Sequence, residues 1–134
     1  MLKYTGVLFD LDGTLLDTSD LIIKSFQHTF KIHYQRELKP EEVYPFFGKT
    51  LRAAMETLGP DKVEELIATY REYNLAQHDH LISAFAGVAE IVHALYSAGI
   101  TLGVLTSKTQ ATALRGLRLF NLDKYFTAVV GADQ

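Results

Sequence analysis

The stretch that decides the fold is Val7-Leu8-Phe9-Asp10-Leu11-Asp12-Gly13-Thr14-Leu15, close to the start of the chain. Its first three residues form a continuous apolar run, which is typical of a strand buried on both faces in a parallel sheet. The polar residues from Asp10 to Thr18 are expected to form a loop, with Gly13 as its flexible point. The stretch therefore predicts a buried strand that ends in two carboxylates, two residues apart.

Outward from this strand, the chain alternates between two kinds of pattern. Residues from about 19 to 80 carry helical spacing only, with Thr50 as one N-cap and Pro60 at the start of a long helix. Residues 84–87 are interpreted as a linker. A helix, a strand at 100–105, a helix and a strand at 128–131 follow. This order predicts an α/β fold with a parallel sheet and a helical insert after the first strand.

The composition narrows the possible partners. The net charge is −3 and no basic stripe occurs, so neither nucleic acid nor a membrane surface is expected to bind. The 134 residues contain no cysteine, no signal-peptide pattern at Met1 and no apolar run long enough for a membrane helix. These features favour a cytoplasmic protein, and the chain is expected to be a monomer or a homodimer.

The two carboxylates after the first strand indicate a particular chemistry. Close carboxylates repel each other, so they favour a divalent cation between them or a shared proton, and their hard oxygens suit Mg²⁺. One of them can attack phosphorus and the other can act as acid and base. Gly13 would let the backbone approach a phosphate, and Thr14 would offer its hydroxyl and amide. The alternative is an ordinary acidic turn after a strand.

The same stretch resembles the first motif of the haloacid dehalogenase superfamily, and Leu102-Gly103-Val104-Leu105-Thr106-Ser107-Lys108 resembles its second. The resemblance implies a Rossmann-like core at 1–17 and 83–134 and an α-helical type-one cap at 18–82. It implies that Asp10 is the nucleophile and a Mg²⁺ ligand, and that Asp12 is the acid/base, with its main-chain carbonyl on the metal. The phosphate-binding residues implied are Gly13, Thr14, Thr106, Ser107 and Lys108.

Segments of the expected cap resemble a subgroup of bacterial pyrophosphatases and phosphoglycolate phosphatases. Since the cap chooses the substrate in this superfamily, the resemblance implies a small phosphorylated substrate, pyrophosphate before phosphoglycolate. Within the cap, a glycine break and two cations lie near a helix N-terminus, which could receive a second anionic group. An exposed loop with routine charges is the alternative. The residues concerned are Gly48, Lys49, Thr50 and Arg52.

Two further expectations concern what the motifs leave open. The superfamily also needs a lysine and an acidic pair after the third strand, so the core is expected to be incomplete and the chain alone to be weakly active or inactive. Lys108 is not expected to replace that lysine. A phosphosugar mutase and a non-catalytic truncated fragment stay open as alternatives. His78 and His80 are expected to lie at a solvated helix end and not to bind metal.

Overall fold

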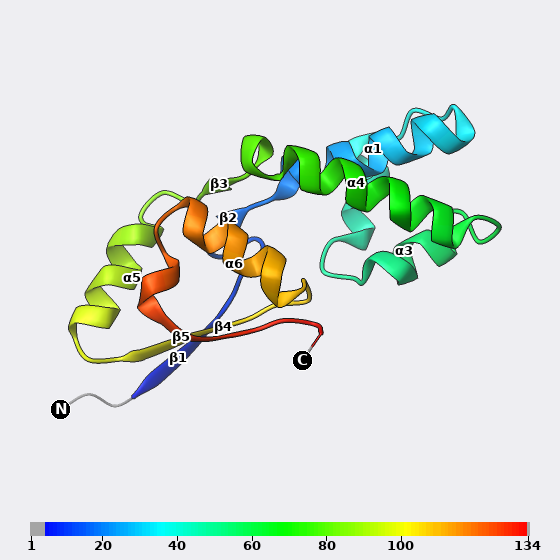
Figure 1. The fold of residues 1–134 in the computed structure, drawn as a ribbon. Helices are drawn as coiled ribbons and strands as arrows, with labels where there is room; N and C mark the ends of the chain where they lie inside the picture. Colours follow the sequence, from blue (N-terminus) through cyan, green and yellow to red (C-terminus); the bar gives the residue numbers. More distant parts are fainter. Residues whose placement is uncertain (1–4, 134) are drawn as a thin grey trace. The chain divides into compact units, whose positions relative to one another are not determined.

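The computed structural model describes residues 5–133, which fall into two compact units (Figure 1). The sheet unit comprises the chain up to Thr18 and from Ile82 onward, and the helical unit comprises Ser19–Leu81. Each unit is described by itself below.

The sheet unit contains a three-stranded parallel sheet in the order β1-β4-β5, which confirms the predicted α/β class. Its strands are β1 (Gly6–Asp10), β4 (Thr101–Leu105) and β5 (Phe126–Val130). The strand predicted at 128–131 therefore starts two residues earlier. Helix α5 (Val88–Ser97) contacts β4, helix α6 (Gln110–Leu119) contacts β5, and the 3₁₀ turn η2 (Asp123–Tyr125) leads into β5.

Figure 1 shows α5 and α6 on the same side of the strands, as two right-handed crossovers in one direction require. On that side Leu102, Val104 and Leu117 are buried. On the other side Leu8 is 71% exposed and Leu105 is 55% exposed, so the expectation that β1 is buried on both faces is wrong for the described residues. An apolar run cannot tell which of its alternating side chains a helix will cover.

Two very short strands mark the points where the chain leaves and re-enters the sheet unit. β2 (Leu16–Asp17) pairs antiparallel with β3 (Ser83–Ala84), with Leu16 opposite Ala84. The loop expected up to Thr18 therefore contains both residues of β2, and the linker expected from Ala84 contains one residue of β3. Leu16 is buried, so these backbone groups need partners out of water, and the antiparallel pairing supplies them.

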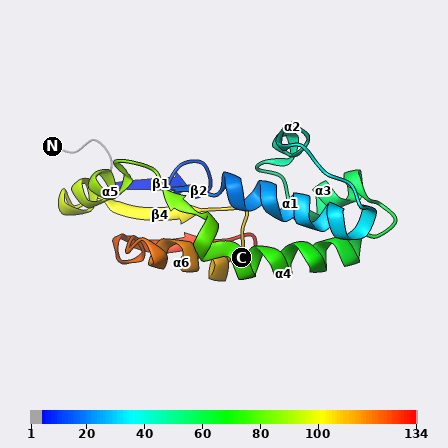
Figure 2. The same cartoon turned by 90° about the horizontal axis from the view of Figure 1, so that it is seen from above.

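The helical unit consists of helices and one 3₁₀ turn. They are α1 (Ser19–Tyr34), α2 (Pro40–Val43), η1 (Tyr44–Phe46), α3 (Leu51–Leu58) and α4 (Val63–Leu81). Helices α1 and α4 lie side by side along much of their length (Figure 2). Phe30, Val43, Met55 and Leu66 are at most 1% exposed and form the centre of its apolar core.

The expected helix boundaries hold at Thr50 and fail at Pro60. The Thr50 side chain accepts a hydrogen bond from the amide of Ala53 at 3.2 Å, as an N-cap does. Helix α4 begins at Val63 and not at Pro60. The amide of Lys62 donates to the carbonyl of Gly59 at 3.1 Å, so Pro60 is the second residue of a β-turn, a position its fixed φ suits equally well.

Two leucines of α6 provide a matched test of the sheet unit's core. Leu117 is fully buried and Leu119 is 41% exposed. Leu117→Ala should lower the free energy of unfolding by about 2–5 kcal/mol, because it leaves a cavity, whereas Leu119→Ala should cost less than about 1 kcal/mol. Urea titrations followed by circular dichroism measure both. Equal losses in the two variants would contradict this account of the core.

Candidate active site

The loop after β1 is a tight turn fastened by its own backbone. The carbonyl of Leu11 accepts hydrogen bonds from the amides of Thr14, Leu15 and Leu16 at 3.0–3.3 Å. Gly13 has a φ of +78°, where a side chain would be strained, and its amide donates to the Leu16 carbonyl at 2.9 Å. Leu11 and Leu15 are each 2% exposed and anchor the turn in the core. The Gly13 and Thr14 amides, which were expected to bind phosphate, donate hydrogen bonds within the loop. Thr14 itself is exposed, so its hydroxyl can still reach a phosphate.

The loop after β4 lies beside this turn because β1 and β4 are paired in register, with Asp10 opposite Leu105. Thr106 is 7% exposed, and its amide donates to the carbonyl of Val130 at 3.0 Å. Its hydroxyl oxygen accepts from the Lys108 amide at 3.1 Å, so the hydroxyl hydrogen can be directed to another acceptor. Ser107 is exposed at the same loop.

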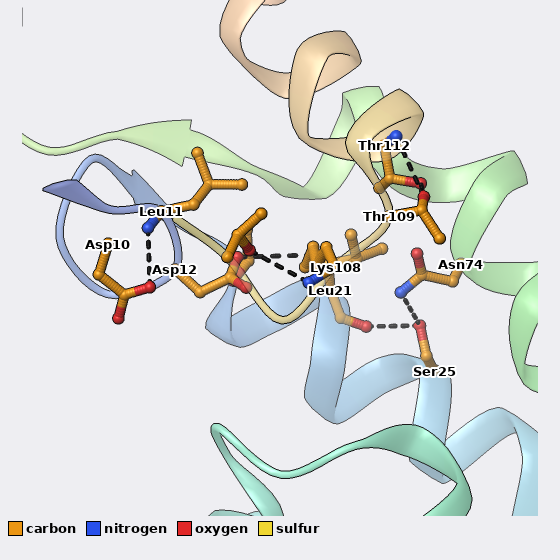
Figure 3. A network of polar contacts seen from close by, with 11 residues as sticks. Asp10, Leu11, Asp12, Leu21, Ser25, Asn74, Lys108, Thr109 and Thr112 are labelled. Atoms are coloured by element: carbon orange, nitrogen blue, oxygen red, sulfur yellow. Dashed lines mark hydrogen bonds and ion pairs between the residues drawn. The ribbon is translucent and has the colours of Figure 1, made fainter. Parts of the chain in front are cut away.

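Asp12 and Lys108 meet between the two loops. The Lys108 Nζ lies 3.5 Å from the Asp12 Oδ1, with both side chains about a fifth to a quarter exposed (Figure 3). The Thr18 hydroxyl donates to the same carboxylate oxygen at 2.9 Å. The expected grouping of Asp12 with the end of β4 is therefore present, and Thr18 is an additional contact that the motif comparison did not single out.

Asp10 has a different environment from Asp12. Its Oδ1 accepts a hydrogen bond from the Leu11 amide at 2.9 Å, and the residue is exposed. Figure 3 shows the Asp10 carboxylate turned away from Lys108 and the Asp12 carboxylate turned towards it. One carboxylate is thus held by a cation and a hydroxyl, while the other keeps an oxygen open to solvent. This difference suits two distinct chemical roles.

The donor atoms at this edge fit a magnesium ion in part. Among residues 5–133, no group of three or more His, Cys, Asp or Glu side chains could hold a metal ion. Mg²⁺ can manage with one or two carboxylates because it keeps several waters. The Asp10 carboxylate and the Asp12 main-chain carbonyl supply such hard oxygens. The Asp12 carboxylate is already occupied by Lys108 and Thr18.

The residues expected to receive a second anion lie at the start of α3, within the helical unit. Gly48 has a φ of +80°, and the Lys49 Nζ lies 5.9 Å from the centre of the Phe46 ring. The Arg52 guanidinium donates to both carboxylate oxygens of Glu64, at 2.7 and 3.3 Å. An anion that binds Arg52 would have to compete with this carboxylate.

Of the two histidines near the end of α4, His78 differs from the expectation of a solvated side chain and His80 agrees with it. His78 is only 2% exposed and its Nδ1 lies 2.8 Å from the Asp79 Oδ1, so the expectation of a solvated side chain is wrong for His78. His80 is exposed. His78 follows Ile67 and Asn74 on one helical face, and its burial depends on tertiary packing that a lone polar residue does not reveal.

None of the described helices has the length and hydropathy of a membrane span.

The ion pair in the helical unit gives a testable pH dependence. Hydrogen bonds from the Arg52 guanidinium lower the pKa of the Glu64 carboxyl. A lowered folded-state pKa adds stability above the ordinary pKa of glutamate, about 4.3, and this stability is lost as the pH falls through the lower value. Arg52→Gln should therefore raise the pKa of Glu64 towards its ordinary range. A carbon-13 NMR titration of the Glu64 carboxyl measures it, and an unchanged pKa would show that the pair does not form in solution.

Comparisons with known proteins give the arrangement a family. A model of the haloacid dehalogenase-like hydrolases matches residues 7–134. The pyrophosphatase PpaX of Halalkalibacterium halodurans is 43% identical over 132 residues, a match covering 98% of this chain and 61% of that protein. PpaX of Listeria monocytogenes serotype 4b (strain CLIP80459) is 44% identical over 133 residues, with the same coverage of both chains. The chain thus spans about three fifths of the length of these relatives.

The solved structures agree with the sequence comparison. A haloacid dehalogenase-like hydrolase, SP0104 from Streptococcus pneumoniae, superposes with a TM-score of 0.89 at 28% identity, over 98% of this chain and 62% of that one. The match of the family model extends through the loops after β1, β4 and β5. Fold, motif loops and sequence similarity together show that this chain belongs to the haloacid dehalogenase-like hydrolases.

Proposed function

We propose that this chain carries the nucleophile and acid/base residues of a Mg²⁺-dependent phosphohydrolase whose substrate is pyrophosphate. The observation that carries the proposal is the different setting of two carboxylates on one loop. Asp10 is exposed, whereas Asp12 is held by Thr18 and Lys108. The similarity to relatives named PpaX supports pyrophosphate as the substrate.

Asp10 is the proposed nucleophile. The Leu11 amide fixes its Oδ1, so the carboxylate has a set orientation while Oδ2 can attack phosphorus. Attack forms an aspartyl-phosphate and breaks the bond from phosphorus to the bridging oxygen of the substrate. The exposed position of Asp10 at the end of β1 leaves room for the phosphoryl group.

Asp12 is the proposed acid and base. In its protonated form it would give a proton to the departing phosphate, and as a carboxylate it would then take one from the water that attacks the aspartyl-phosphate. Thr18 and Lys108 hold its Oδ1, which leaves Oδ2 for proton transfer. Water returns the Asp10 carboxylate and releases inorganic phosphate, so atoms and protons balance over the cycle.

The end of β4 supplies the proposed phosphoryl-binding groups. The Thr106 hydroxyl accepts from the Lys108 amide and can donate its hydrogen to a phosphoryl oxygen. The Ser107 and Thr14 hydroxyls are exposed at the two loops and could add donors. A Mg²⁺ ion held by the Asp10 carboxylate and the Asp12 carbonyl would supply positive charge for the phosphoryl oxygens.

A chimera tests the activity without assuming how long the natural protein is. This chain is joined to the roughly two fifths of Listeria monocytogenes PpaX that lie outside the match, and phosphate release from pyrophosphate is measured with Mg²⁺. Hydrolysis of pyrophosphate in preference to phosphoglycolate supports the proposal. Preference for phosphoglycolate, transfer of phosphate from a hexose phosphate without release, or no turnover on any of them would each refute it. The chain by itself serves as a comparison.

The nucleophile assignment predicts a specific loss. In the chimera, Asp10→Asn should lower turnover by at least about 10³-fold, because an amide oxygen cannot form the acyl-phosphate at a comparable rate. Asp123→Asn, a control in the 3₁₀ turn η2 of the same unit, should stay within about twofold of the parent. Acid quench with radiolabelled pyrophosphate measures the phosphoenzyme directly. A phosphoenzyme that survives Asp10→Asn would overturn the assignment.

Substrate specificity is proposed to involve Gly48, Lys49, Thr50 and Arg52. Because Glu64 occupies the Arg52 guanidinium, Glu64→Gln should make Arg52 more available to an anion. The KM for pyrophosphate in the chimera should then fall about two- to fivefold, because the substrate no longer has to displace a charged partner from the guanidinium, and exposed ion pairs have modest effects. Glu65→Gln, on the next residue of α4, is the matched control. An unchanged KM in Glu64→Gln would remove Arg52 from the proposed specificity residues.

A cytoplasmic location is also proposed, which the absence of cysteine from the sequence supports, and the assembly state proposed is a monomer or a homodimer. Light scattering behind a sizing column distinguishes the two assembly states, and a larger assembly would contradict the proposal.

A further inference from the structure

The loop after β5 is fastened to the loop after β4 by hydrogen bonds from both sides. The Ala132 amide donates to the Lys108 carbonyl at 2.7 Å. The Gln110 amide donates to the Asp133 Oδ1 at 3.0 Å, and the Gln110 side-chain amide donates to the Val129 carbonyl at 3.0 Å. Asp133, in the loop after β5, thus contacts the first turn of α6.

The start of α6 explains why a carboxylate lies there. Thr109 is the N-cap, and its hydroxyl accepts from the Thr112 amide, which leaves the Gln110 amide in need of another acceptor. Asp133 supplies that acceptor from a distant part of the chain. Its negative charge also lies at the positive end of the helix dipole, where it is favourable.

Gly131 makes the close approach of the two loops possible. It is buried, and a Cβ at this position would lie 2.4 Å from the Gln110 nitrogen and 2.7 Å from the Lys108 carbonyl oxygen. Both of these neighbours are backbone atoms, which cannot rotate away. A side chain here would therefore push the two loops apart and break the contacts that Ala132 and Asp133 make.

These contacts converge on the backbone of Lys108. The Lys108 amide donates to the Thr106 hydroxyl, and the Lys108 carbonyl accepts from the Ala132 amide. Asp133 accepts from the amide of Gln110, the first residue of α6. We propose that Asp133 is a positioning residue: it fixes the loop after β4 so that the Lys108 amine faces the Asp12 carboxylate. The catalytic consequence rests on the proposed function, whereas the contact itself can be measured without any turnover.

The first experiment observes Lys108 directly in the chain itself. Lysines are labelled by reductive carbon-13 methylation, and Lys108→Arg assigns the Lys108 signal. Asp12→Asn removes the partner and defines the shift expected for a Lys108 that has lost its carboxylate. Asp133→Ala should move the signal at least half as far in the same direction. Asp133→Asn, which keeps an oxygen acceptor, and Asp123→Ala, a control in the same unit, should move it by less than a quarter as much.

Two results would overturn the proposal. One is a Lys108 signal that Asp12→Asn moves and Asp133→Ala leaves in place. The other is a signal that Asp133→Asn moves as far as Asp133→Ala, because the acceptor oxygen would then be irrelevant. Gly131→Ala is the second variant: it should move the signal in the same direction, because it separates the same two loops. Circular dichroism confirms that each variant is folded.

The second experiment asks whether Asp133 acts through Lys108. In the chimera, Asp133→Ala should lower kcat for pyrophosphate about fivefold or more and leave KM within about twofold, because the Lys108 amine lies beside the Asp12 carboxylate, the proposed acid and base. In a Lys108→Ala background the same change should have almost no further effect. Additive losses would overturn the proposal. Failure of the parent chimera to hydrolyse any substrate would refute the proposed function alone, since the NMR result stands independently.

Discussion

The parallel pairing of β1 with β4 is the constraint on which the site depends. Parallel strands end at the same edge of a sheet, so in-register pairing up to Asp10 and Leu105 brings the two following loops together. Asp12 and Lys108 are 96 positions apart in the sequence and come within 3.5 Å for this reason. A shift of one residue in this register would turn Leu102 and Val104 out of the core, so the packing of the sheet and the geometry of the site are fixed by the same contacts.

The polar groups of the loops also hold one another through hydrogen bonds. The Thr106 amide donates to the Val130 carbonyl, which fixes the position of Thr106. The Thr106 hydroxyl in turn accepts from the Lys108 amide and fixes the backbone of Lys108. The loop after β5 then holds the carbonyl of Lys108. Each hydrogen bond of this kind contributes about 1 kcal/mol to stability. Each also restricts the conformations of the residue that makes the next hydrogen bond. These side chains are therefore oriented without a ligand, a property that the proposed phosphohydrolase would need for electrostatic stabilisation of its substrate.

Much of the fold follows from the sequence, because hydrophobic periodicity and capping residues act locally. The strand at β4 and the N-cap at Thr50 are of this kind. The burial of His78 and the exposure of Leu8 are not, because each depends on which element lies against that face. In the site, the positions of Asp10 at the end of β1 and of Asp12 and Thr106 after their strands follow from the motifs. The hydrogen bonds from Thr18 to Asp12 and from Gln110 to Asp133 involve partners that no local pattern connects.

The ion pair between Lys108 and Asp12 is better explained by chemistry than by stability. Both side chains are partly buried, and a pair in that setting loses hydration energy that its attraction barely offsets. A stable fold could place apolar residues there at no loss. What the pair does is separate two carboxylates on one loop: it compensates the charge of Asp12 and leaves Asp10 exposed to solvent. Two identical groups two residues apart thereby have unequal surroundings, and the proposal that they have different roles rests on this difference.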